Sequence, residues 1–136
     1  MEQTHLRPLL VLSGLFLIAL AVRVIYFIEL SQLPYFDVVL PVYDHFNFDQ
    51  GALNFAAGDG LARSPNNSYS PLYKYFLGSL YFIFGRNFYV VYGLQFVLGA
   101  LGAVLIFSIG KRLFDIRVGF LAFIGFAFYS TEIIYE

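Results

Sequence analysis

Three long apolar runs and one polar segment alternate along this chain, and this pattern predicts a helical membrane protein. The first run begins near Leu9 and continues past Arg23, for about twenty residues, which is enough for a helix to cross a hydrocarbon core of roughly 30 Å. A cleaved signal peptide would end sooner, at a small-residue site. We therefore expect an all-α, multi-pass membrane protein with three transmembrane helices, at about residues 8–30, 88–110 and 117–135.

The polar segment, at about residues 31–87, is too long to be a simple connector. Asp44 suits a helix N-cap and Gly58 suits a helix end, so we expect one short helix over residues 44–57. A second short helix is expected from Pro71 to Phe84, where the apolar stretch is too short to span a bilayer. We expect both to lie at the membrane interface, as parts of one N-terminal membrane domain.

The composition agrees with a membrane protein and excludes several other classes. The 136 residues are 60% hydrophobic and only 12% charged, with a mean hydropathy of +0.73. A soluble domain would carry about twice that share of charge. The net charge of -1 offers no basic face for nucleic acid. Since the chain has no cysteine, disulfides and thiolate metal sites are excluded.

The positive charges predict an orientation in the cell membrane. Lysine and arginine tend to remain on the cytoplasmic side of membrane proteins. If the helix from Pro71 to Phe84 lies in the interface rather than across the bilayer, then Arg7, Lys111, Arg112 and Arg117 share one side. We therefore expect a cytoplasmic N-terminus and an extracytoplasmic acidic segment.

Three aspartates in the polar segment are the candidate chemistry of this chain. We interpret Asp44 as a catalytic carboxylate at a membrane surface, with a helix N-cap as its alternative role. Asp49 fits either a substrate contact or a solvated, hydrogen-bonding position, and Asp59 between two glycines fits a turn. Their spacing matches no cation-binding loop that we can justify, and we expect no metal.

Two cations and a group of tyrosines accompany these acids. Arg23, near the outer end of the first helix, either anchors that helix at the interface or faces a lipid phosphate. Lys74 interrupts the expected helix that begins at Pro71. Tyr69 and its neighbours fit an aromatic belt first, with stacking on a sugar as the alternative.

Short motifs follow one another along nearly the whole chain: Arg23-x-x-Tyr26, Asp44-x-x-x-Phe48-Asp49-x-x-Ala52, Gly58-Asp-Gly60, Tyr69-Ser-Pro71-Leu-Tyr-Lys-Tyr-Phe-Leu, Phe84-Gly85, Gln95 and Lys111-Arg-Leu-Phe. In order and spacing this series resembles the N-terminal third of GT-C glycosyltransferases of the protein mannosyltransferase and aminoarabinose transferase superfamily. The resemblance implies a longer, multi-spanning enzyme that transfers a sugar from a polyprenyl-phosphate-linked donor to an extracytoplasmic acceptor. The chain would then be an N-terminal fragment of it.

The resemblance also implies roles for particular residues. Asp44 would accept the proton of the acceptor hydroxyl, and Arg23, Asp49, Tyr69 and Lys74 would bind substrate. No cofactor is implied. The sugar stays open, because Ser70 stands where the aminoarabinose branch commonly has a lysine.

Two alternatives from other functional classes remain. A non-catalytic membrane subunit would explain the short length, and a module that binds lipid-linked sugar would explain Arg23 and Lys74 without a role for Asp44. Replacement of Asp44 by Asn distinguishes these alternatives from the enzyme hypothesis. Only an enzyme that uses Asp44 as its base would lose sugar transfer.

Overall fold

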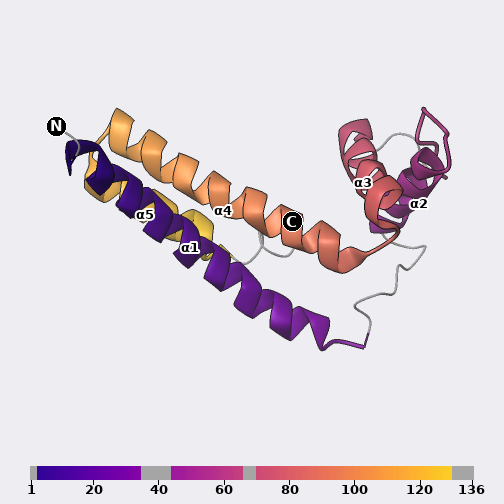
Figure 1. Cartoon of the computed structure of the whole chain (residues 1–136), viewed down its shortest axis with the longest axis horizontal. Coiled ribbons are helices and arrows are strands. Elements are labelled where there is room, and N and C mark those ends of the chain that lie inside the picture. The colour runs from indigo at the N-terminus through magenta and orange to yellow at the C-terminus, as the bar shows by residue number, and fades with distance from the viewer. Residues whose placement is uncertain (1–2, 35–43, 66–69, 130–136) are drawn as a thin grey trace. The chain divides into compact units, whose positions relative to one another are not determined.

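The structure, a computed structural model, describes residues 3–34, 44–65 and 70–129, and for residues 3–8 it describes the backbone alone. Within these ranges the chain forms five α-helices and no strand (Figure 1). The helices are α1 (Gln3–Ser31), α2 (Asp44–Ala56), α3 (Pro71–Phe84), α4 (Phe88–Leu113) and α5 (Ile116–Ala127). The all-α prediction is confirmed for the described part of the chain.

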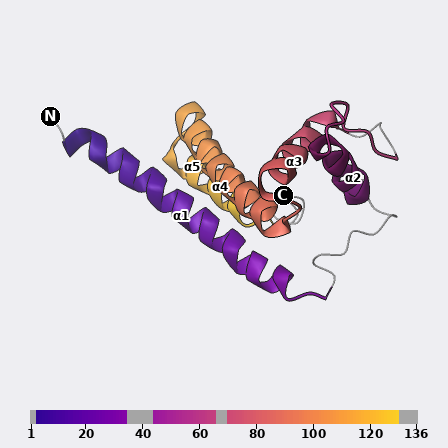
Figure 2. The same cartoon turned by 45° about the vertical axis from the view of Figure 1, so that its right-hand side comes forward.

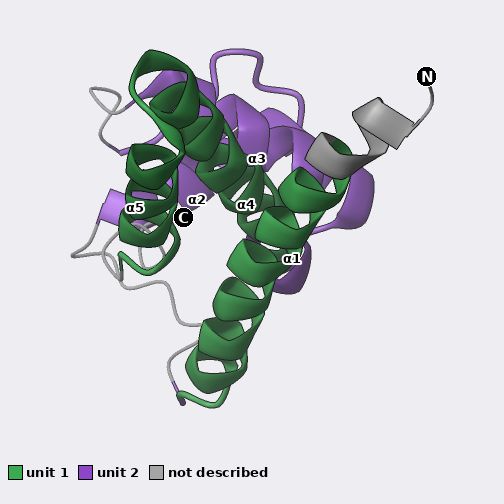
Figure 3. Ribbon diagram, turned by 90° about the vertical axis from the view of Figure 1, so that its left-hand side faces the viewer, with its two compact units in different colours: residues 1–33, 93–136 green, residues 34–92 purple. Residues whose placement is uncertain are grey.

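The helices belong to two compact units, coloured separately in Figure 3. Unit 1 consists of residues 1–33 and 93–136, which contribute α1, α5 and most of α4. Unit 2 consists of residues 34–92, which contribute α2, α3 and the first residues of α4. The polar segment of the sequence is therefore a unit of its own, inserted in the chain between the first apolar helix and the rest of the second.

Two helices are long and apolar enough to cross a membrane, at Leu9–Ser31 in α1 and Phe88–Leu113 in α4. Only 17% and 33% of their most apolar windows are buried, so neither is the enclosed core helix of a soluble domain. Large apolar side chains point outward along both, among them Leu10, Leu17, Ile18, Leu105 and Ile109. Exposed apolar surfaces of this kind mark contacts with a membrane or with other proteins.

Small residues form much of the interior of unit 1. Ala19 of α1 and Ala100 and Ala103 of α4 are fully buried in its core, together with Phe107. The helices α4 and α5 lie side by side (Figure 2), and a Cβ on Gly110 would lie 3.0 Å from the Cα of Gly119. Close approach through small residues is typical of helix packing in membranes, where the lipid is as apolar as the protein surface.

The connection between α4 and α5 is shorter than the sequence predicted. We expected a turn over residues 111–117, but Lys111 and Arg112 continue the last turn of α4. Asp115 caps α5 by accepting hydrogen bonds from two backbone N–H groups, 2.7 Å from that of Arg117. A helix starts at such a cap because the cap satisfies its first N–H groups.

The third predicted transmembrane helix, at residues 117–135, is seen only in part. α5 has 12 residues, a length of about 18 Å, which is less than the hydrocarbon core of a bilayer. Residues 130–136 lie outside the described part of the chain.

Unit 2 is built around the close contact of α2 with α3. Ala52 of α2 is buried against Leu77 and Tyr81 of α3. Two glycines allow this approach: a Cβ on Gly51 would lie 2.6 Å from Cδ of Lys74 on α3, and one on Gly78 would lie 2.6 Å from the ring of Phe55 on α2. Both helices occupy nearly the ranges predicted for them, because Pro71 at the start of α3 and Gly85 after it, at φ 73°, fix its ends.

Candidate functional site

A hydrogen-bonded ion pair lies at the centre of unit 2. The carboxylate of Asp49, on α2, is buried and accepts two hydrogen bonds from the guanidinium of Arg86, at 2.9 Å from Nε and 3.2 Å from Nη2. The hydroxyl of Tyr81, on α3, donates to the same carboxylate at 2.9 Å. This group of three residues joins α2, α3 and the α3–α4 turn, so its immediate effect is to hold unit 2 together.

The surroundings of Tyr81 keep its phenol neutral. Burial raises the pKa of Tyr81 well above its usual value of 10, and the negative charge of Asp49 and the hydrogen bond to it raise it further. A phenolate beside a carboxylate would be both desolvated and repelled. Tyr81 is therefore a permanent hydrogen-bond donor to Asp49 in unit 2.

Arg86 also contacts an aromatic ring. Its guanidinium carbon lies 4.7 Å from the centre of the Phe88 ring, within the range of cation–π attraction. The planar, bidentate geometry with Asp49 suits an arginine and would not be reproduced by a lysine.

Asp59 serves the turn that follows α2. Its carboxylate accepts hydrogen bonds from the backbone N–H groups of Leu61 and Arg63, each at 3.1 Å. The hydrogen bond from Arg63 is the main reason that the pKa of Asp59 lies below its usual value, with the bond from Leu61 second. The sequence interpretation of Asp59 as a turn residue agrees with this geometry.

Asp44 differs from both of these aspartates. It lies in the first turn of α2 and its side chain is exposed. Of the three aspartates in the described part of unit 2, it alone is exposed, whereas Asp49 is buried in the ion pair and Asp59 is engaged in its turn. A carboxylate in the first turn of a helix is stabilised by the exposed N–H groups there. Asp44 is therefore the acid in this part of the unit that is most accessible to a second molecule.

Lys74 is buried, which the sequence did not indicate. The side chain on α3 is 2% exposed, and Nζ donates to the hydroxyl of Ser64 at 2.7 Å. The aliphatic part of Lys74 passes over Gly51, where any Cβ would lie 2.6 Å from its Cδ. A lysine can occupy this position because its stem packs on apolar surface while its ammonium group is hydrogen-bonded.

Arg23 is completely buried in unit 1. Its Nη1 donates to the backbone oxygen of Ala19 at 3.4 Å, and its guanidinium lies 5.8 Å from the centre of the Phe126 ring. We predicted an interfacial anchor or a cation that faces a lipid phosphate; a side chain with no exposed surface does not fit the snorkelling anchor. Arg23 belongs to unit 1, whereas Asp44, Asp49 and Lys74 belong to unit 2.

The remaining predicted site residue, Tyr69, lies outside the described part of the chain. Among the residues that are described, no three His, Cys, Asp or Glu side chains are grouped closely enough to hold a metal ion. Of the five predicted site residues, Asp44, Asp49 and Lys74 therefore lie in unit 2 in the structure.

Two residues of the buried group were missed at the sequence level. Neither Arg86 nor Tyr81 was among the predicted site residues. Each lies more than 30 residues from Asp49 along the chain, so local spacing carries no sign of the contact. The sequence did offer a chemical signal. A single arginine directly after a helix can pair with an aspartate whose carboxylate would otherwise be buried without a counter-charge.

Comparisons of the chain with protein-family models, with curated proteins and with solved structures found no match. The chemistry of the site therefore has to be argued from its own residues. Among its described residues, unit 2 offers one exposed carboxylate, that of Asp44, on a helix that the part-buried ion pair of Asp49 and Arg86 helps to hold in place. An accessible carboxylate can accept a proton from a bound molecule.

Proposed function

We propose that this chain is part of a membrane glycosyltransferase, in which Asp44 is the base for sugar transfer from a polyprenyl-phosphate-linked donor. The acceptor is an extracytoplasmic protein, lipid or glycan. This function rests on the resemblance of the motifs to GT-C enzymes, on the two candidate membrane spans and on the state of the three aspartates.

The observation that carries the assignment is the contrast among these aspartates. A general base must be able to reach the proton that it accepts. Asp49 has its carboxylate occupied by Arg86 and Tyr81, and Asp59 has its carboxylate occupied by backbone N–H groups. Asp44 is exposed, so it is the aspartate best placed for proton transfer.

The reaction requires only one carboxylate. The acceptor oxygen attacks the anomeric carbon of the sugar while Asp44 takes the hydroxyl proton. The bond between the anomeric carbon and the phosphate oxygen breaks, and its electron pair leaves on the lipid phosphate. Because that phosphate is stable as an anion, no second carboxyl group is needed to protonate it, in contrast to a glycosidase.

The leaving phosphate would be stabilised by cations or N–H groups. Lys74 is the candidate in unit 2, and it would exchange its hydrogen bond with the Ser64 hydroxyl for one with a phosphate oxygen. Arg23 belongs to unit 1, where its side chain is buried.

The test is a transfer assay on the full-length protein in lipid nanodiscs, with a panel of polyprenyl-phosphate sugars. Asp44→Asn should lower kcat by about 10²-fold to 10⁴-fold, the usual contribution of a positioned base. Donor affinity should be unchanged, because Asn has the same shape as Asp. The matched control is Asp59→Asn, the same chemical change at an aspartate engaged in a turn, which should retain most of the rate.

A wild-type rate in the Asp44→Asn protein would contradict the proposal. If the panel shows donor binding without any transfer by the native protein, the chain is instead a binding module. If it shows neither, the alternative of a non-catalytic membrane subunit is supported.

A further inference from the structure

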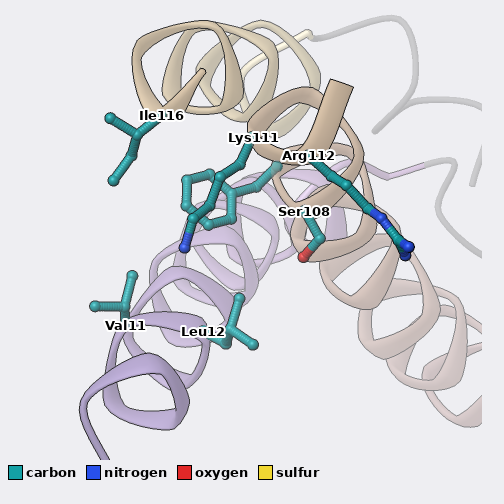
Figure 4. Close-up of a pocket in the computed structure, with 7 residues that line it drawn as sticks. Val11, Leu12, Ser108, Lys111, Arg112 and Ile116 are labelled. Carbon is teal, nitrogen blue, oxygen red and sulfur yellow. The ribbon is translucent and has the colours of Figure 1, made fainter. Parts of the chain in front are cut away.

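A groove lies within unit 1, between the beginning of α1 and the junction of α4 with α5. It has a volume of about 630 Å³, within the range of about 300–1,000 Å³ that is usual for sites of small ligands. Its lining is shown in Figure 4 and consists of Val11, Leu12, Phe107, Ser108, Lys111, Arg112 and Ile116.

The groove combines an apolar interior with a basic rim. Val11 and Leu12 of α1 and Ile116 of α5 line it with aliphatic side chains. The hydroxyl of Ser108 donates to the backbone oxygen of Val104 at 2.8 Å, so it is already engaged within α4. Four of the seven lining side chains are thus apolar, a fifth has its polar group turned to its own helix, and the remaining two are cations.

The two cations flank the groove. Lys111 and Arg112 are adjacent in the last turn of α4 and both are exposed. In Figure 4 the ammonium group of Lys111 extends toward Val11, whereas the guanidinium of Arg112 extends in the other direction, past Ser108. An anionic group at the mouth of the groove beside Lys111 would meet one cation directly, with Arg112 as a second positive charge on the same helix turn.

The walls of the groove are held by a close helix contact. A Cβ on Gly119 of α5 would lie 2.9 Å from the backbone oxygen of Phe107 and 3.0 Å from the backbone nitrogen of Lys111. The rings of Phe107 and Phe120 also lie 5.0 Å apart. Since these are contacts between residues with little freedom to move, the groove is a built feature of the α4–α5 pair.

We propose that this groove binds an anionic phospholipid, with an acyl chain along Val11, Leu12 and Ile116 and its phosphate beside Lys111, while Arg112 adds to the positive potential at this end of α4. Charge complementarity selects this occupant: a neutral helix brings no negative charge to the two cations, and a zwitterionic lipid brings its phosphate together with a cation of its own. Basic pockets between membrane helices commonly bind acidic lipid headgroups in this way. The proposal depends on α1 and α4 being embedded in lipid and is independent of the proposed role of Asp44.

The test compares retained lipids on the full-length protein by native mass spectrometry, after reconstitution with equal amounts of phosphatidylglycerol and phosphatidylcholine and mild delipidation. The native protein should retain phosphatidylglycerol preferentially. Replacement of both cations, Lys111→Gln with Arg112→Gln, should reduce that preference by about tenfold to thirtyfold, the effect of two charges near a lipid surface. The charge control is Arg117→Gln, which removes a nearby exposed cation that does not line the groove.

A second pair of variants tests the apolar part. Ser108→Phe places a ring in the groove and should reduce the retention of phosphatidylglycerol. The matched control Ile109→Phe adds a ring on the exposed side of the same helix turn and should leave retention unchanged. Equal retention of the two lipids by the native protein, or an undiminished preference after loss of both cations, would overturn the proposal, as would an effect of Ile109→Phe equal to that of Ser108→Phe.

Discussion

The two units of this chain differ in what fills their interiors. In unit 1 the interior is rich in alanine and glycine, while leucine and isoleucine side chains cover much of the exposed surface of α1 and α4. In unit 2 the interior contains aromatic residues and the ion pair of Asp49 with Arg86, while Asp44, His45 and Asn54 are exposed.

The difference shows that the units are built for different surroundings. Burial of large apolar side chains stabilises a structure only when the alternative is water. In lipid that gain is absent, so helices associate by close contact between small residues. The interior of unit 1 follows the second pattern and that of unit 2 the first, and α3 of unit 2 also exposes large apolar side chains at Leu72, Phe82 and Ile83.

The largest loss of stability should follow when the ion pair of unit 2 is broken. Asp49→Ala leaves the guanidinium of Arg86 and the hydroxyl of Tyr81 without their shared acceptor. We expect a loss of about 2–3 kcal/mol in the stability of unit 2, because the buried hydroxyl of Tyr81 loses its acceptor and Arg86, whose side chain is 37% exposed, loses its charged partner but keeps access to solvent. Thermal unfolding of the full-length protein in detergent, followed by proteolysis, measures it. Asp44→Ala, at an exposed aspartate of the same helix, should change stability little.

A smaller loss is expected from the helix contact of unit 1. Gly119→Ala places a methyl group against the backbone of α4, at Phe107 and Lys111, where no side chain can move aside. Overpacking of this kind costs about 1–3 kcal/mol. Gly125→Ala, on the same helix with no atom near its added Cβ, is the control. If both variants unfold at the same temperature, the α4–α5 packing described above is wrong.

Removal of one hydrogen bond in unit 2 should have a milder effect. Tyr81→Phe keeps the ring and the pair of Asp49 with Arg86, so the expected loss is about 1 kcal/mol.

The native protein should also lose stability as the pH rises above 10, the usual pKa of tyrosine. In that range the unfolded chain gives up the phenol proton, while the raised pKa of Tyr81 keeps it on the folded protein. The Phe variant should show a weaker alkaline decline; an equal decline would contradict the burial of Tyr81.

The smallest effect should come from the turn after α2. The lowered pKa of Asp59 means that its contribution to stability is present above the usual value of 3.8 and is lost as the pH falls through the lowered one. Because that contribution is present at pH 7, Asp59→Asn should lower stability slightly there and should weaken the acid dependence of unit 2. Acid unfolding followed by circular dichroism measures this difference between the two proteins.

The helices could be predicted from the sequence, because their signals are local. Pro71 and Gly85 mark the ends of α3 within the chain itself, and the apolar run from Phe88 predicts most of α4. The boundary at Lys111 and Arg112 could not be placed correctly. Two charged residues at the end of an apolar run fit a turn as well as a last helical turn, and the choice depends on the cap at Asp115.

The state of the site residues could be predicted only in part. Asp59 was correctly interpreted, since a turn aspartate bonds to N–H groups close by in sequence. The burial of Asp49 and Lys74 depends on partners from other elements, Arg86 and Ser64. No periodic pattern in the sequence indicates a pair of residues that lie far apart along the chain. From residue type alone, both Asp49 and Lys74 would be expected to be exposed.

The central claim is that α4 crosses a bilayer, with unit 2 at its outer end and the basic groove at its inner end. Because the native chain contains no cysteine, single cysteines can be placed at Gly60, which is exposed in unit 2, and at Phe114, which is exposed after α4. In intact cells a membrane-impermeant maleimide should label Gly60→Cys, and it should label Phe114→Cys only after permeabilisation. Labelling of both cysteines from the same side would contradict the account.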